Sequence, residues 1–205
     1  AYVGGLAGRG YYAKNSTNSV DIDYRGGGSY VGGIFGYCPQ SGSYSLVGLT
    51  NKGSIAGASY VGGLVGGLVN ETSSYSAQTL TLETLENRGI VTGTGDYVAG
   101  LFGCLYASNR HDALKIAAND LTNTGDITGN TYVGGLIGDG YSNTSQSYIK
   151  NGTNSSNISA TAYTGCIAGK LVNIGLENCT NAGSTLQATG HVFTETFLSS
   201  VVHAS

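Results

Sequence analysis

The hydrophobic and polar positions of this chain follow a pattern that fits neither a helix nor a simple strand. In the stretch YVGGLVG, residues 60–66, a straight strand would place Tyr60 and Leu64 on one face and Val61 and Val65 on the other. Both faces would then be apolar. A half-buried strand would alternate apolar and polar residues. Two readings fit. In the first, the Gly-Gly pair bends the strand so that the residues before and after the pair all point inward. In the second, the strand is straight and both of its faces are covered. We favour the bend, because glycine permits close backbone approach.

The same heptad occurs six times, with its tyrosine repeating every 28 to 37 residues. The copies are AYVGGLAG from Ala1, SYVGGIFG from Ser29, SYVGGLVG from Ser59, DYVAGLFG from Asp96, TYVGGLIG from Thr131 and AYTGCIAG from Ala162. A second motif of the type T-N-x-G-x-I lies between successive copies and once after the last copy. Its asparagines are Asn18, Asn51, Asn87, Asn123, Asn154 and Asn181.

A repeat of this length, made of short strands and glycine turns, cannot bury its own apolar face, whereas stacked copies can. We therefore predict an all-β fold, a parallel β-solenoid (β-helix) of about six coils of 28–37 residues with variable inserts. It is expected to occupy residues 1–190, with a degraded repeat or C-terminal cap at 191–205. Helical periodicity is nearly absent, and its best example, HDALKIAAND at 111–120, predicts one short helical turn in an insert.

The repeated asparagines predict a structural column. Asparagine tolerates left-handed turns, and its amide can hydrogen-bond up and down a stack of identical side chains. A threonine precedes the asparagine in all copies except the third, which has Glu86. An exposed threonine column can form an ice-binding or ligand-binding face, but a single column beside a turn is more typical of plain β-propensity.

Composition supports β-structure and narrows the range of partners. The chain has 35 glycines and one proline, and the glycines lie among Tyr, Val, Ile and Leu without a collagen period. Charged residues make up 10% of it and the formal net charge is -3, so we expect neither a nucleic-acid partner nor binding to anionic lipid. No apolar run is long enough to insert into a membrane, and the first residues do not form a signal peptide. The chain is expected to be a mature product or a piece of a longer one.

The heptads resemble the GLUG repeat, whose Gly-Leu-hydrophobic-Gly core occurs here as GLAG, GIFG, GLVG, GLFG and GLIG. The last copy, CIAG, departs from it at Cys166. GLUG repeats occur in bacterial adhesin-like surface proteins and in non-catalytic regions of immunoglobulin A metallopeptidases. The resemblance implies a structural or adhesive extracellular module, either a stalk or a filament-forming segment. The alternative is a carbohydrate-binding or protein-binding module that uses the inserts on one solenoid face.

The residues that could perform catalysis or hold a metal are scattered along the sequence. His111, His191 and His203 are far apart, and none has the H-E-x-x-H context of a metallopeptidase. Asp21 and Asp23 form the closest acidic pair and could bind Ca²⁺ or serve a glycosidase, but the pair is not repeated, which favours a solvated strand face. We therefore expect no enzymatic activity, no metal and no cofactor.

The four cysteines do not predict a disulfide framework. Cys38 and Cys104 follow the second and fourth heptads, so about two coils separate them, beyond the reach of a disulfide. Cys166 and Cys179 lie within one unit and could form a bridge; buried thiols that act as small apolar groups are the alternative.

Two sets of residues point to an extracellular surface. Seven asparagines fit the N-glycosylation pattern Asn-x-Ser/Thr and are candidate glycan sites: Asn15, Asn70, Asn143, Asn151, Asn154, Asn157 and Asn178. The alternative is that they reflect only the richness of the chain in Asn, Ser and Thr. Nine tyrosines lie in or beside the inserts: Tyr11, Tyr12, Tyr24, Tyr37, Tyr44, Tyr75, Tyr106, Tyr141 and Tyr148. They could contact sugars or host surface proteins, although we favour the alternative that they pack the inserts over the coil. An open solenoid end could also pair with the rest of a larger chain or, head to tail, with another copy.

Overall fold

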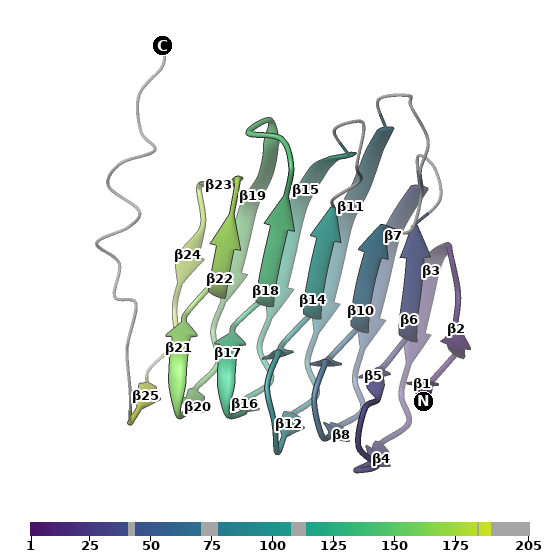
Figure 1. Cartoon of the computed structure of the whole chain (residues 1–205), viewed down its shortest axis with the longest axis vertical. Helices are drawn as coiled ribbons and strands as arrows, with labels where there is room; N and C mark the ends of the chain where they lie inside the picture. Colours follow the sequence, from purple (N-terminus) through teal and green to yellow (C-terminus); the bar gives the residue numbers. More distant parts are fainter. Residues whose placement is uncertain (41–43, 71–77, 108–113, 184, 190–205) are drawn as a thin grey trace.

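The computed structural model describes residues 1–40, 44–70, 78–107, 114–183 and 185–189, and all regular structure in these ranges is β-strand. The strands form four sheets, named A to D here, in which every pair of neighbours is parallel. The chain visits the sheets in the order A, B, C, D and then returns to sheet A one layer further along the axis (Figure 1). The predicted parallel β-solenoid is therefore confirmed.

The strands are short, and each sheet receives one from every layer, except that sheet C receives two from the last layer. Sheet A contains β1 (Tyr2–Gly4), β5 (Tyr30–Gly32), β9 (Val61–Gly62), β13 (Val98–Ala99), β17 (Thr131–Gly134) and β21 (Ala162–Gly165). Sheet B contains β2 (Ala7–Arg9), β6 (Phe35–Gln40), β10 (Val65–Asn70), β14 (Phe102–Ala107), β18 (Ile137–Ser142) and β22 (Ala168–Val172). Sheet C contains β3 (Ala13–Asn18), β7 (Tyr44–Asn51), β11 (Gln78–Asn87), β15 (Leu114–Asn123), β19 (Ser147–Asn154), β23 (Ile174–Glu177) and β24 (Thr180–Asn181). Sheet D contains β4 (Ile22–Tyr24), β8 (Ile55–Gly57), β12 (Val91–Gly93), β16 (Ile127–Thr128), β20 (Ile158–Ala160) and β25 (Leu186–Ala188).

The Gly-Gly pair of each heptad forms the corner between sheets A and B. In the third copy, β9 ends at Gly62 and β10 begins at Val65. Val61, Leu64 and Val65 are all fully buried, although they alternate in parity along the chain. The corner explains this, because the chain changes direction between them. The bent-strand reading of YVGGLVG is correct.

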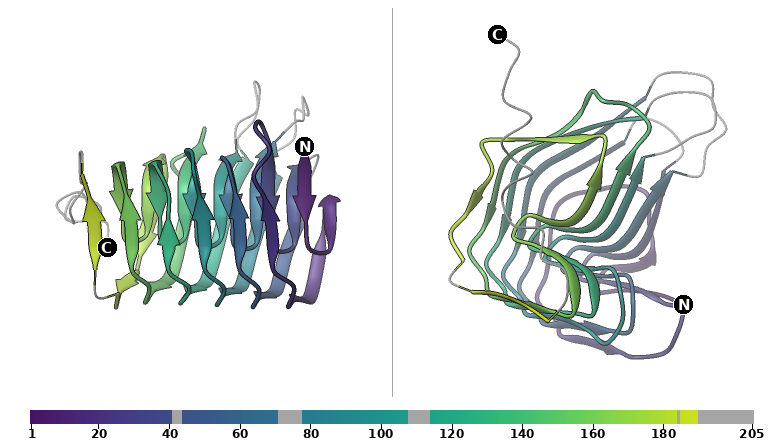
Figure 2. Two further views of the ribbon diagram at one scale, coloured as in Figure 1. Left: turned by 90° about the horizontal axis from the view of Figure 1, so that it is seen from below. Right: turned by 60° about the vertical axis from the view of Figure 1, so that its left-hand side comes forward.

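Two hydrophobic clusters fill the interior. The larger one lies between sheets B and C and includes Leu68 and Leu82, and the smaller one lies between sheets A and D and includes Val61 and Ile55. In both, a residue packs on its equivalent in the next layer, since the heptads and the asparagine motifs are paired in register. Figure 2 shows this stacking from the side and the nested outlines of the layers from the end.

The predicted six coils are not borne out, because the solenoid has about four complete turns. We call a turn complete when a neighbouring layer covers it on both sides, as is the case between Tyr30 and Ala160. The strands before and after this stretch are end layers with one neighbour. Leu6 in the first layer is therefore 50% exposed, whereas its equivalents Ile34 and Leu64 are fully buried. Counting motif copies overestimated the number of turns that stacking encloses.

The short helical turn predicted at 111–120 is also wrong where the structure describes it. Residues 114–120 belong to β15, which pairs with β11 over nine positions, from Gln78 with Leu114 to Asn87 with Asn123. Ile116 and Ala118 are buried at every second position, the period of a strand. Stacking on β11 therefore overrides the weak helical pattern.

Candidate functional site

A ladder of asparagine amides runs through the interior, parallel to the solenoid axis. In every layer of the ladder except its last, Nδ2 donates one hydrogen bond to the Oδ1 of the asparagine in the next layer, over distances of 2.7 to 2.9 Å. A second hydrogen bond goes from Nδ2 to a carbonyl oxygen two residues further along its own turn, such as Gly53 O and Gly89 O. The ladder comprises Asn18, Asn51, Asn87, Asn123 and Asn154, all at most 2% exposed.

The ladder stops before the sixth asparagine. Asn181 is exposed, and no amide hydrogen bond joins its side chain to that of Asn154, although the backbones of the two residues are paired. In the earlier layers each amide lies directly against the second glycine of its own heptad, as Asn87 lies against Gly63, so that a methyl group on that glycine would overlap the amide. The last heptad carries Cys166 at this position. A Cβ atom at this position would overlap an amide placed as in the earlier layers, which accounts for Asn181 lying outside the ladder.

The tyrosines of the heptads form a second axial stack at the start of sheet A. Neighbouring ring centroids are 4.5 to 5.2 Å apart from Tyr30 through Tyr60, Tyr97 and Tyr132 to Tyr163. The last four of these residues have φ between 49° and 65°, a left-handed conformation that is uncommon for a bulky residue. Burial raises the pKa of the Tyr60 and Tyr97 hydroxyls. The rings therefore stabilise one another along the axis, and their faces are covered by their neighbours.

A buried carboxylate that the sequence analysis did not single out lies on sheet B. Asp139 is 6% exposed, and its Oδ2 accepts a hydrogen bond of 2.8 Å from the Tyr106 hydroxyl. Its Oδ1 lies 3.5 Å from Lys170 Nζ, and the same ammonium group is 5.6 Å from the centroid of the Tyr132 ring. Burial, followed by the bond to Asp139, raises the pKa of Tyr106. The only sequence signal was that an acidic residue replaces Cys104 of the previous layer.

A row of left-handed residues crosses the outer face of sheet C. Their φ angles lie between 47° and 64°, and the row consists of Asn15, Gly48, Thr84, Asp120, Asn151 and Asn178. Asparagine, aspartate and glycine adopt this conformation most readily. Asn15, Asn151 and Asn178 are also candidate glycan sites, so the backbone gives an independent reason for an asparagine at three of the seven positions.

Burial divides the candidate glycan sites. Asn15, Asn143, Asn151, Asn157 and Asn178 are exposed, whereas Asn70 is 8% and Asn154 0% exposed. Because Asn154 accepts from Asn123 within the ladder, the folded solenoid has no room for a glycan on it. Glycosylation of the exposed sites stays a prediction.

Thr84 is the exception in the left-handed row, because it is β-branched and has a φ of 53°. A non-glycine residue in this region costs roughly 1–3 kcal/mol, and asparagine tolerates it better. Thr84→Asn should therefore raise the free energy of unfolding by about 1 kcal/mol, measured by urea denaturation. Thr122→Asn, in sheet C without a positive φ, is the control and should be slightly destabilising because asparagine has low β-propensity. Equal changes in the two variants would contradict the strain.

The acidic pair does not form a joint site. Asp21 Oδ1 accepts a hydrogen bond of 2.7 Å from the backbone N–H of Ser54, whereas Asp23 Oδ1 pairs with Arg25 Nε at 2.8 Å. Among the described residues, no group of three His, Cys, Asp or Glu side chains could hold a metal ion. The three histidines, His111, His191 and His203, lie outside the described residues, as does the predicted cap at 191–205.

The bridge between Cys166 and Cys179 is not formed, because both residues are thiols in the structure. Cys166 lies at the corner between sheets A and B, whereas Cys179 lies between β23 and β24 of sheet C, where its Sγ donates to Ile149 O at 3.5 Å. Cys38 and Cys104 are also thiols, and both are fully buried. The alternative reading, in which buried thiols act as small apolar groups, fits Cys38 and Cys104, whereas Cys166 and Cys179 are half-buried.

Thiol reactivity should follow this burial. Burial raises the pKa of Cys104 strongly and that of Cys179 more moderately, and the thiolate is the reactive form. With iodoacetamide at pH 8, Cys179 should be labelled in the native protein, whereas Cys104 should be labelled only after unfolding, as read by peptide mass spectrometry. In denaturant without reductant all four cysteines should react; a count of two would contradict the absence of the bridge.

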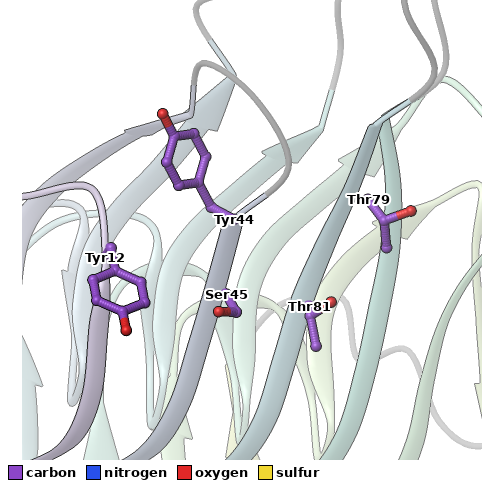
Figure 3. Close-up of a pocket in the computed structure, with 5 residues that line it drawn as sticks. All are labelled: Tyr12, Tyr44, Ser45, Thr79 and Thr81. Atoms are coloured by element: carbon purple, nitrogen blue, oxygen red, sulfur yellow. The ribbon is translucent and has the colours of Figure 1, made fainter.

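A shallow groove lies over β7 and β11 of sheet C (Figure 3). Its lining consists of Tyr12, Tyr44, Ser45, Thr79 and Thr81, none of which is charged. Tyr12 precedes β3 and is 56% exposed, and the other residues come from β7 and β11. Of the other tyrosines near the inserts, Tyr11, Tyr24 and Tyr141 are exposed, Tyr37 is buried, and Tyr75 lies outside the described residues.

In the described part of the chain, no helix is long and apolar enough to cross a membrane. No known family model matches the chain, so the likeness to the GLUG repeat stays a resemblance, and no solved structure matches it either. Halomucin from Haloquadratum walsbyi (strain DSM 16790 / HBSQ001) is 36% identical over 89 residues. The aligned stretch is 43% of this chain and 1% of halomucin. The chain is thus a β-solenoid module distantly related to a much larger protein, of which it spans a very small part.

Proposed function

We propose that this chain is a non-catalytic structural segment of a large extracellular or cell-surface protein, in which it acts as a stiff spacer. The observation that carries the proposal is the axial continuity of the fold. Four parallel sheets, the asparagine ladder and the tyrosine stack all run in the same direction through successive layers. Bending such a rod would stretch hydrogen bonds and ring contacts together, so the module resists bending.

Support for the non-catalytic role comes from how the repeated residues are used. The motif asparagines bond one another, the tyrosines stack, and the glycines allow the corner and the close approach of layers. Each repeated residue type therefore has a role in stacking that accounts for its recurrence. The chemistry of the repeat is that of assembly.

Support for the location comes from the relative and from the surface. Halomucin is a surface-associated protein, and the aligned stretch is 1% of its length. The exposed candidate glycan sites, such as Asn143 and Asn157, fit the same surroundings. We further propose that the repeats are of the GLUG type, since the second glycine of each copy except the last is required by the asparagine ladder.

The intact mass of the native polypeptide, measured after enzymatic removal of glycans, tests this proposal. We expect a mass far above the 20.8 kDa of this chain. The mass before glycan removal should be higher again if the exposed sites are used. A native mass near 20.8 kDa would overturn the role as a segment and would favour head-to-tail association of separate copies instead.

A further inference from the structure

A row of paired residues passes through the groove and continues beyond it across five neighbouring strands of sheet C. At the start of β3, Ala13 pairs with Leu46 of β7, so the preceding residue, Tyr12, lies beside Ser45. Ser45 pairs in turn with Thr81 of β11. Thr81 in turn pairs with Ala117, and Ala117 pairs with Tyr148. Two tyrosines therefore flank three small side chains. With parallel strands about 4.8 Å apart, the row is about 19 Å long and runs parallel to the solenoid axis.

Two of the small residues of this row, Ser45 and Thr81, carry hydroxyl groups. Ser45 and Thr81 are half-buried, and no described residue hydrogen-bonds either hydroxyl. Both hydroxyls can donate as well as accept, which suits a ligand that carries many hydroxyl groups of its own. A flat row of such side chains between aromatic rings is unlike the heptad stack, in which the ring faces are already covered.

The tyrosines at the two ends offer ring surface to a ligand. Tyr12 is 56% exposed, and the Lys14 ammonium lies 6.0 Å from its centroid, at the outer limit of a cation–π contact. Tyr148 is half-buried, and Lys115 Nζ lies 5.4 Å from its ring. The groove lining itself is uncharged, which disfavours an anionic ligand within it.

We propose that this row, from Tyr12 over Ser45 and Thr81 to Tyr148, is a binding site for a neutral oligosaccharide chain that lies parallel to the solenoid axis. Sugar rings pack on the exposed tyrosine faces, and sugar hydroxyls bond to Ser45 and Thr81. A pyranose unit is about as long as the strand spacing, so the row accommodates about four units. The site works in the same way whether the module belongs to a longer chain or is complete.

Isothermal titration of the whole chain with neutral oligosaccharides of two to six units, of the gluco, manno and N-acetylglucosamine types, tests the site. We expect at least one series to bind, with affinity that rises up to about four units. Tyr12→Ala and Tyr148→Ala should each weaken binding about tenfold, because an aromatic contact of this kind accounts for about that factor. Thr81→Val, which removes the hydroxyl but keeps the shape, should weaken it by a smaller factor.

The matched control is Tyr24→Ala, which removes an exposed tyrosine of the same first layer from sheet D. It should leave the affinity unchanged. The proposal is overturned if no neutral series binds at millimolar concentration, or if Tyr24→Ala weakens binding as much as Tyr12→Ala. Equal or tighter binding of a sulfated or uronic-acid oligosaccharide would also overturn it, since attraction to Lys14 and Lys115 would then be the cause.

Discussion

Asn87→Ala should lower the free energy of unfolding by about 3–5 kcal/mol, because three buried polar groups lose a partner at once and each costs roughly 1–3 kcal/mol. Asn51 Nδ2 loses one of its two acceptors, at 2.8 Å, and keeps Gly53 O. Asn123 Oδ1 loses its donor at 2.7 Å, and Gly89 O loses a donor at 2.8 Å. A domain is stable by about 5–15 kcal/mol in total. The loss should therefore be plain in urea denaturation followed by circular dichroism.

Position in the ladder provides the controls for this prediction. Asn154→Ala removes the last member, so it should cost less than Asn87→Ala, and Asn181→Ala, at the exposed position outside the ladder, should cost under about 0.5 kcal/mol. If Asn87→Ala does not fold, the ranking of the other two variants still tests the ladder. Equal losses for Asn154→Ala and Asn181→Ala would show that axial amide bonding contributes little.

The repeated residues made the layers and the asparagine ladder predictable. Residues such as Tyr60 and Asn87 recur with their neighbours in the same order, and in a parallel solenoid equal positions stack on one another. The register of the sheets then follows from the alignment of the copies. The sequence could not show that an end layer is uncovered, which is why the count of motif copies exceeded the number of complete turns.

Features on the outer faces were hidden because they do not repeat by letter. The left-handed row on sheet C contains Gly48, Thr84 and Asp120, which share a backbone conformation rather than a side chain. Asp139 occupies a position that is Gly67 and Cys104 in the two preceding layers. The groove joins residues separated by inserts of different length, so no fixed spacing marked it. Only the stacking of the layers brings such residues together.

The second large effect is expected from Gly63→Ala, which adds a single methyl group. At this position a Cβ atom would overlap Gly100 O in the next layer and the amide of Asn87. Neither neighbour can withdraw, because the carbonyl belongs to the backbone of a packed turn and the amide is bonded on both sides. We expect a loss of at least about 3 kcal/mol, at the upper end for overpacking.

Other glycines test whether overlap causes this loss. Gly27→Ala, where no atom lies within 4 Å of the added Cβ, should be close to neutral. Gly62→Ala should also be destabilising, because a Cβ atom there would overlap Val65 O and Leu101 O, although Ala99 occupies this position in the next layer. Thermal unfolding of the three variants gives the comparison. If Gly27→Ala is as destabilising as Gly63→Ala, overlap with the packed neighbours is not the cause of the loss. The same ladder argument makes Cys166 compatible with the last layer only, since there the amide of Asn181 has already left the stack.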